Sequence, residues 1–394
     1  NNNYGALVDG VTLNADTKTA NSAVDADVNV LAESSNLAVA VAAGVAVIEG
    51  DKAFEATGSI SVNNVEGGVT SKVNNSDFNA ANTSINALNK DKFVNVAGGI
   101  TLSSKSAGIS YAMNKMSTTT GAYLYDTQIK HEAGAAVAVN ASNTAKFVAV
   151  GAGIGASNIG INGSLGINFG TNNVEAIADG KKKVTQAKKL NNITDLTVNS
   201  NDSSRLTAVA GVFYIASSDP SKMFSGVAIG GAFAWNELGH DKQQHNKAEL
   251  NNYIISTQAK PESTDATKDR SAKIDVEATD DASFYTVGAG VAIVAGKDAK
   301  GAIEGAGVYA KLHKDTEAVI SSIELDKKAA NSKADADTSG AAKVKVSANE
   351  GNSITDVAAV LDLGKGWTVI GGAASVTDTE TQTKAHVENS TINA

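Results

Sequence analysis

The most constraining feature of the chain is a repeat: the same pattern occurs six times along the 394 residues, with turns between the copies. The first copy has an apolar run with a central glycine, VAVAAGVAV from Val39, then a turn and a second stretch, ATGSISVNNV. The structural repeat position is occupied, at spacings of 55, 54, 58, 79 and 69 residues, by Gly44, Gly99, Gly153, Gly211, Gly290 and Ala359. A period in this range predicts a stacked array in which each unit contacts only its neighbours.

The repeats organise the whole chain, 1–394, as a single array. We expect a partial unit over 1–20 followed by six units with the approximate bounds 21–80, 81–131, 132–190, 191–268, 269–338 and 339–394. The opening segment YGALVDGVTLNA matches the segment that closes the last unit, TKAHVENSTINA. We therefore expect an internal fragment of a longer chain, which stacks on neighbouring repeats of that chain.

Residues within a unit alternate with a period of two, which is typical of β-strands. In the first apolar run the larger residues and the small residues take opposite faces: Val39, Val41, Ala43 and Val45 against Ala40, Ala42, Gly44 and Ala46. Neither face is polar, so we expect both faces to be covered and the small face to let another layer come close. These features predict an all-β fold, a β-solenoid of six repeats of about 55 residues with parallel ladders between the copies.

The paired apolar runs of each unit, here called its arms, leave one question open. A turn of only a few residues, rich in Gly, Ser, Asp and Lys, separates the two arms. The arms could form a hairpin that projects from a three-strand coil, or they could be two stacked sides of a further coil. Turn length is compatible with either arrangement.

Composition limits the function classes. The net charge is −9 and acidic and basic residues are interspersed, which argues against a nucleic-acid partner. The chain has no cysteine, which we interpret as a sign of export through an oxidising compartment, although a reducing compartment would also explain it. The longest apolar run, 37–48, is too short to span a bilayer, so we expect no membrane insertion by this segment.

Few residues suggest chemistry. His240 and His245 lie in a polar stretch without thiols, and the carboxylate pairs at 280–281 and 335–337 do not recur in register between units. The glycine-rich GAGIGASNIG matches a packing position of the other copies better than a phosphate loop. We therefore predict no catalytic residues, no metal site and no cofactor.

Departures from the repeat are better candidates for function, because insertions map to surface loops. The largest are 242–272 and 326–341; a helix within 326–337 is a further possibility. Both insertions could equally be mobile loops without a function. We take as a candidate ligand-contact surface the scarce aromatic residues and histidines in or near these segments: Trp235, His240, His245, Tyr253 and Trp367.

With its repeat laid out, the chain resembles the large filamentous adhesins of Gram-negative bacteria, which include autotransporter passengers and two-partner-secreted haemagglutinin-like proteins. It is most similar to the fusobacterial-type adhesin and leukotoxin group. The motifs that carry the resemblance are LAVAVAAGVAV (37–47), GSISVNN (58–64), TGAYL (120–124) and STINA (390–394). The resemblance implies a right-handed parallel β-helix, a cell-surface or secreted location, and a role in adhesion or host-cell killing.

Three functions follow from these features. The first is a structural rod segment of a bacterial adhesin that attaches to a receptor, protein or glycan, on host or partner cells, and is not an enzyme. The second is a fragment of a leukotoxin-like secreted cytotoxin. The third, a carbohydrate-active β-helix enzyme, needs clustered acids and basic groups, whereas Arg205 and Arg270 are the two arginines of the chain and lie far apart in sequence.

Overall fold

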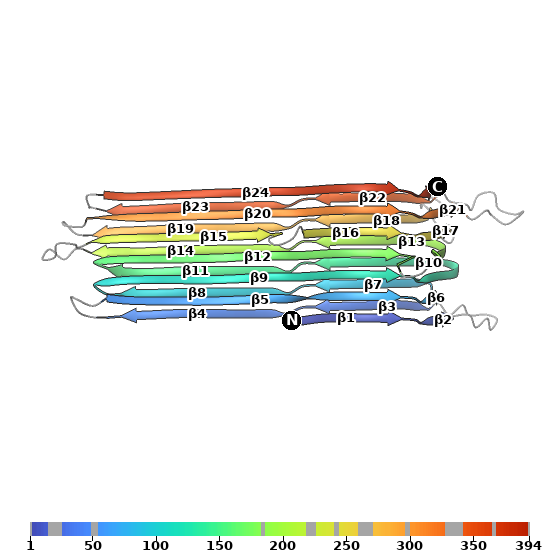
Figure 1. Ribbon diagram of the computed structural model, residues 1–394, viewed down its shortest axis with the longest axis horizontal. Coiled ribbons are helices and arrows are strands. Elements are labelled where there is room, and N and C mark those ends of the chain that lie inside the picture. The colour runs from blue at the N-terminus through green and yellow to red at the C-terminus, as the bar shows by residue number, and fades with distance from the viewer. Residues whose placement is uncertain are drawn as a thin grey trace, which may run out of the picture.

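The computed structural model forms a β-solenoid made of three parallel sheets (Figure 1). It describes residues 2–14, 26–48, 54–182, 186–217, 226–239, 244–258, 271–295, 300–327, 342–364 and 368–392. Strands are the regular elements in these ranges, and no helix in them has the length and apolar character needed to cross a membrane. The all-β solenoid predicted from the repeat is confirmed.

One coil of the solenoid consists of four strands. In the first coil, β3 (Asp27–Ser34) leads through a corner into β4 (Leu37–Val47). The chain then reverses through the segment that joins β4 to β5 (Phe54–Asn74), a strand of 21 residues, and β6 (Asp77–Asn79) closes the coil. Equivalent strands of successive coils pair in parallel, which builds the three sheets.

We name the sheets by their strands. The long sheet contains β1 (Asn2–Asp9), β5, β9 (Lys105–Tyr125), β12 (Ile159–Asp179), β15 (Val227–Leu238), β16 (Gln244–Asn251), β20 (Gly301–Ser321) and β24 (Thr368–Glu388). The wing sheet contains β4, β8 (Lys92–Leu102), β11 (Lys146–Ser157), β14 (Arg205–Ser217), β19 (Ser283–Ala295) and β23 (Ser353–Gly364). The short sheet contains β2 (Thr12–Asn14), β3, β6, β7 (Asn82–Asn89), β10 (Gln128–Asn143), β13 (Lys188–Asp202), β17 (Tyr253–Thr257), β18 (Lys273–Asp280), β21 (Glu324–Lys327), β22 (Lys343–Glu350) and β25 (Thr391–Ile392).

The open question about the arms has a clear answer. The two arms of a unit are not a hydrogen-bonded hairpin, because β4 pairs with β8 in the wing sheet whereas β5 pairs with β9 in the long sheet. The second arm also continues without a break into the closing segment of its unit, as one long strand. Each arm is therefore one side of a widened coil.

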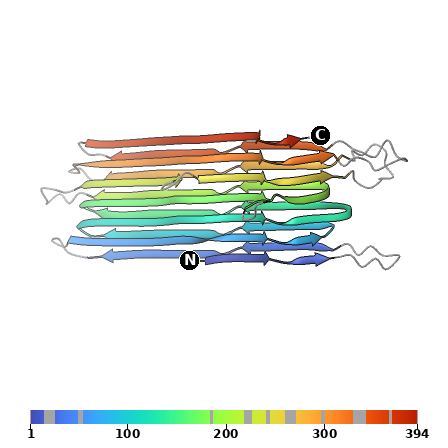
Figure 2. The same ribbon diagram turned by 45° about the vertical axis from the view of Figure 1, so that its right-hand side comes forward.

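The long sheet divides the molecule into two halves, because each half of this sheet packs against a different sheet. Its strands of 21 residues begin opposite the wing sheet and end opposite the short sheet, as the two views show (Figures 1 and 2). We call the half with the wing sheet the wing and the half with the short sheet the stem. A strand of 21 residues spans about 70 Å, whereas six stacked coils span about 29 Å, so in this chain the strand direction is the longer one.

The stem has an ordinary apolar core between its two sheets. Inward residues of the short sheet and of the long sheet meet in one buried cluster, which includes Ile85, Val139, Val198, Ile274, Leu124, Ala176, Leu250 and Ile320. A left-handed residue follows most strands of the long sheet at the corner, and Asn75, Asp126 and Asn252 fill this position with φ of 46°, 49° and 55°. Asparagine and aspartate tolerate this conformation better than other non-glycine residues.

The wing reverses the usual pattern. Its small residues point inward, while the valines and isoleucines of β4, β8 and β11 point outward and are half-buried or exposed. The prediction that both faces would be covered is therefore wrong for the larger face within this chain. The prediction that the small face lets a layer come close is confirmed, because a Cβ on Gly151 would overlap the backbone of Leu165 in the long sheet.

The register of the repeat glycines agrees with the alignment in the first three coils, where the residues that lie level are Gly44, Gly99 and Gly153. The alignment is wrong by one residue in the fourth and sixth coils. Val212 and not Gly211 lies level with Gly153 and with Gly290, and Val360 and not Ala359 lies level with Gly290. Gly211 instead lies on the outer face. Runs of Gly, Ala and Val look alike after a shift of one residue, although that shift exchanges the two faces of a strand.

The insertion expected over 242–272 is shorter than predicted. Its first part forms β16 in the long sheet and β17 in the short sheet, so it continues the coil after a short interruption. Residues 259–270 lie outside the described residues. The second insertion, 326–341, starts at the end of β21, and the rest of it, with most of the segment considered for a helix, also lies outside them.

Candidate functional site

The outer face of the wing sheet is a continuous apolar surface. One ladder on it has valine in every coil: Val41, Val96, Val150, Val209, Val287 and Val357. The next ladder along the strands contains small residues throughout: Ala43, Gly98, Ala152, Gly211, Ala289 and Ala359. Larger side chains flank the small ladder on its far side, with Ile154 45% and Leu361 52% exposed. The valine ladder therefore forms a ridge and the ladder of small residues forms a groove beside it, and both run across the six coils.

This surface is large for a protein face in contact with water. Nine residues per strand, 39–47 in the first coil, and six strands give roughly 800 Å². None of the outward residues in this band is charged. Basic residues mark its border at the stem, in the row that contains Lys92, Lys146 and Arg205. An apolar patch of this size is typical of a contact surface.

The opposite face of the wing, formed by the long sheet, is apolar as well. A glycine ladder, Gly163, Gly231, Gly305 and Gly372, forms the floor of an open, shallow groove of about 570 Å³. Leu165 and Phe233 line one side of it. Both outer faces of the wing are therefore available for contacts, whereas the outer faces of the stem carry mixed polar and charged side chains.

The predicted contact residues do not form one site. Trp235 lies on the outer face of the long sheet and packs edge to face on Tyr309, with 5.4 Å between ring centroids. His245 lies in strand β16, not in a loop as expected, and its side chain is exposed. Tyr253 is fully buried in the stem, so its place in a contact surface is wrong. His240 and Trp367 lie outside the described residues.

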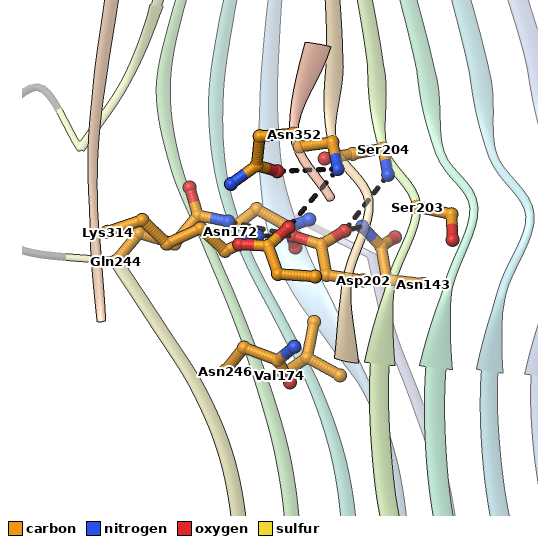
Figure 3. Close-up of polar contacts among 12 residues, drawn as sticks. Asn143, Asn172, Val174, Asp202, Ser203, Ser204, Gln244, Asn246, Lys314 and Asn352 are labelled. Atoms are coloured by element: carbon orange, nitrogen blue, oxygen red, sulfur yellow. Dashed lines mark hydrogen bonds and ion pairs between the residues drawn. The ribbon is translucent and has the colours of Figure 1, made fainter. Parts of the chain in front are cut away.

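A buried charge cluster lies where the wing meets the stem (Figure 3). Asp202 ends β13 and Asp280 ends β18, so both carboxylates occupy the corner between the short sheet and the wing sheet. Lys314 comes from β20 on the opposite side of the coil. Its ammonium group lies 2.7 Å from Asp202 Oδ2 and contacts Asp280 Oδ2. All three side chains have at most 1% of their surface exposed.

The two carboxylates have very different surroundings. Asp202 accepts hydrogen bonds from Asn143 Nδ2 at 2.8 Å, Gln244 Nε2 at 2.8 Å and the Ser204 backbone N–H at 3.0 Å, besides Lys314. Asp280 Oδ1 accepts the Ala282 N–H at 3.2 Å, and Asp280 Oδ2 has no hydrogen bond of normal geometry.

The electrostatics of the cluster follow from this difference. Burial raises the pKa of Asp280 to about 6, although Lys314 acts in the opposite direction. Burial also lowers the pKa of Lys314, but Asp202 and Asp280 outweigh that effect, so the pKa lies above its usual value. One ammonium group is thus shared by two carboxylates in a dry site.

The sequence did not single out Asp202 or Lys314. The expectation that the carboxylates at 280–281 do not recur in register is wrong for Asp280, because Asp202 lies level with it in the neighbouring coil. The strand alternation carried a signal, since Lys314 occupies the inward phase between Leu312 and Thr316, where an unpaired lysine would be costly. A buried lysine predicts a buried acid. Nothing in the linear sequence, however, indicated that Lys314 would lie opposite two aspartates from separate units.

Comparisons with protein-family models, with curated proteins and with solved structures give no match. Among the described residues there is no group of three or more histidines and acids placed to hold a metal ion. The candidate functional features in the described residues are the two apolar faces of the wing and the charge cluster at its base.

Proposed function

We propose that this chain is a structural rod segment of a secreted or surface-displayed bacterial adhesin, which attaches to host or partner cells through the outer faces of its wing. The observation that carries the proposal is the uncharged band of roughly 800 Å² on the wing sheet, which equals the area that one partner buries in a standard protein interface. Coil stacking supplies the rod, because each coil offers the next one a complete set of parallel strand edges.

The resemblance to filamentous adhesins and the absence of cysteine support a cell-surface or secreted location. The receptor is expected to present an apolar protein surface, because burying valine and isoleucine side chains gives the favourable free energy of such a contact. The polar outer faces of the stem fit a part of the rod that stays in water.

Attachment of the purified chain to target cells tests this proposal. The variant Val150→Lys/Ile154→Lys places two charges on the outer face of the wing sheet, and we expect cell binding to fall by about tenfold or more. Thr197→Lys, on the outer face of the stem, is the matched control and should bind like the parent chain. Equal binding by all three proteins would contradict the proposal, and lysis of the target cells instead of attachment would favour a cytotoxin.

A further inference from the structure

We propose that Lys314 forms an intramolecular isopeptide bond with Asp280, which covalently closes the base of the wing in the fifth coil. The proposal starts from position. Across the six coils, the long-sheet residues opposite the corner position of Asp202 and Asp280 are Gly67, Thr118, Asn172, Gln244, Lys314 and Thr381. Lysine occupies this position in the fifth coil alone, and the corner residue of the fifth coil is Asp280.

The site is dry, which a condensation between these groups requires. On the wing side, Leu206, Phe284 and Leu312 belong to one buried apolar cluster. On the stem side, Ala278 and Ala318 belong to the main core. Holding an ammonium and two carboxylates in such surroundings costs free energy, and converting one pair into a neutral amide removes much of that cost.

The hydrogen bonds distinguish the roles of the two aspartates. Asp202 is held as a carboxylate by three donors besides Lys314, so it is suited to stay ionised and to stabilise the positive charge on the Lys314 nitrogen during attack. Asp280 has one oxygen without a hydrogen bond of normal geometry, in direct contact with the nucleophile. The less stabilised carboxyl is the better electrophile, because its neutral form is easier to reach.

The reaction needs no outside reagent. The Lys314 ammonium gives a proton to Asp280, which becomes a neutral carboxylic acid, while Asp202 remains a carboxylate. The free amine attacks Cγ of Asp280, the new C–N bond forms, and a C–O bond breaks with release of one water molecule. In sum, an ammonium and a carboxylate give an amide and water, so the net charge is unchanged. Fixed contact between the reacting groups supplies the rate, as in other intramolecular reactions.

The bond would have a mechanical consequence. Between Asp280 and Lys314 the chain runs out along β19 and back along β20, so the isopeptide bond would close this part of the wing into a ring. A ring closed in this way would resist separation of the two sheets of the wing when the rod is pulled. In the fourth coil a hydrogen bond crosses the same base, from Gln244 Nε2 to Asp202 Oδ2 at 2.8 Å.

Mass spectrometry of the folded full chain tests the proposal. We expect an intact mass lower than the sequence mass by one water molecule, and a branched tryptic product in which peptide 274–297 is joined to peptide 312–327. Fragment ions should place the link at Asp280. A link to peptide 190–205 would assign the bond to Asp202 and would overturn the proposed roles. A folded chain with the full sequence mass after prolonged incubation would overturn the proposal as a whole.

Variants separate the steps of the reaction. Lys314→Met and Asp280→Ala should both have the full sequence mass, whereas Lys345→Ala, which removes an exposed ion pair with Glu277, should keep the loss of water. Asp202→Asn should slow bond formation in a time course after refolding, and faster or unchanged formation would contradict its role in stabilising the charge on the attacking nitrogen. Should a variant fail to fold, the mass of the parent chain still decides whether the bond exists.

Discussion

Gly166 of the long sheet lies directly against Val209 of the wing sheet, so close that a methyl group on Gly166 would overlap the carbonyl oxygen of Val209. The obstacle is backbone on the opposite sheet, which cannot rotate away as a side chain can. The separation of the two sheets in the wing is therefore set by residues that have no side chain. This relationship explains why small residues recur at the inward positions of the apolar run.

We predict that Gly166→Ala destabilises the chain by about 3 kcal/mol or more, because the sheets must move apart to admit the methyl group. Gly211→Ala is the matched control, since a methyl group there meets open space on the outer face. It should change stability by less than about 0.5 kcal/mol. Urea unfolding monitored by circular dichroism measures both values. Similar losses for the two variants would mean that the wing sheets are not in close contact.

A second prediction concerns the asparagine ladder inside the wing. Asn114 Nδ2 donates to Asn168 Oδ1 at 2.7 Å, and Asn168 Nδ2 donates to Asn236 Oδ1 at 2.9 Å. Asn168→Ala leaves the buried Asn236 Oδ1 without this donor, so we expect a loss of about 2–4 kcal/mol. Asn140 makes a similar ladder contact with Asn86 on the outer face of the stem, where water can replace it. Asn140→Ala should therefore cost less than about 1 kcal/mol in the same unfolding experiment.

The sequence predicted the parts of this fold that depend on period. Alternation predicted the strands, and recurrence of the pattern predicted parallel stacking, as the pairing of Val39 with Val94 confirms. The inward face was not predictable in the same way, because Val41 and Ala42 differ in size and not in polarity. Which of them turns inward depends on the opposing long sheet, whose inward Ser, Asn and Gly residues leave room for a small partner.

The charge cluster, too, was only partly predictable from the sequence. The corner residues Asp202 and Asp280 lie at equivalent positions of their units, which alignment of the repeats can detect. Lys314 reaches both aspartates because its strand, β20, continues past the wing into the stem. The sequence left that open, because the two arms were compatible with either a hairpin or a coil.

A third prediction follows from Glu304 in the interior of the wing. Its side chain fills the space over Gly230 and Gly290, and its carboxylate oxygens have no hydrogen-bond partner. Burial raises the pKa of Glu304 to about 7, and Asp362 adds to the shift. Since the folded state then binds a proton more tightly than the unfolded state, stability should be highest at acidic pH and fall as the pH rises from about 4.5 to about 7.

The size of this effect from Glu304 is at most about 3 kcal/mol. Melting temperatures measured at pH 5 and pH 8 should show the difference in the parent chain and a much smaller one in Glu304→Gln. Glu277→Gln, which alters an exposed ion pair on the stem, is the control and should keep the parent's pH dependence. A parent chain that becomes more stable between pH 5 and pH 8 would contradict a buried, unpaired Glu304.

The last prediction tests the modular architecture itself. Deleting residues 81–134 joins Ala80 to Ala135, which is the equivalent of Ala81 one coil later, so the register of every sheet is kept. In the shortened chain β3, β4 and β5 would meet β10, β11 and β12, and Gly44 would lie level with Gly153 as it now lies level with Gly99. Because the strands of each coil pair only with those of adjacent coils, the particle should lose about 4.8 Å along the stack and keep its width along the strands. Small-angle scattering of both chains measures the two dimensions, and a collapsed deletion product would show that distant coils depend on one another.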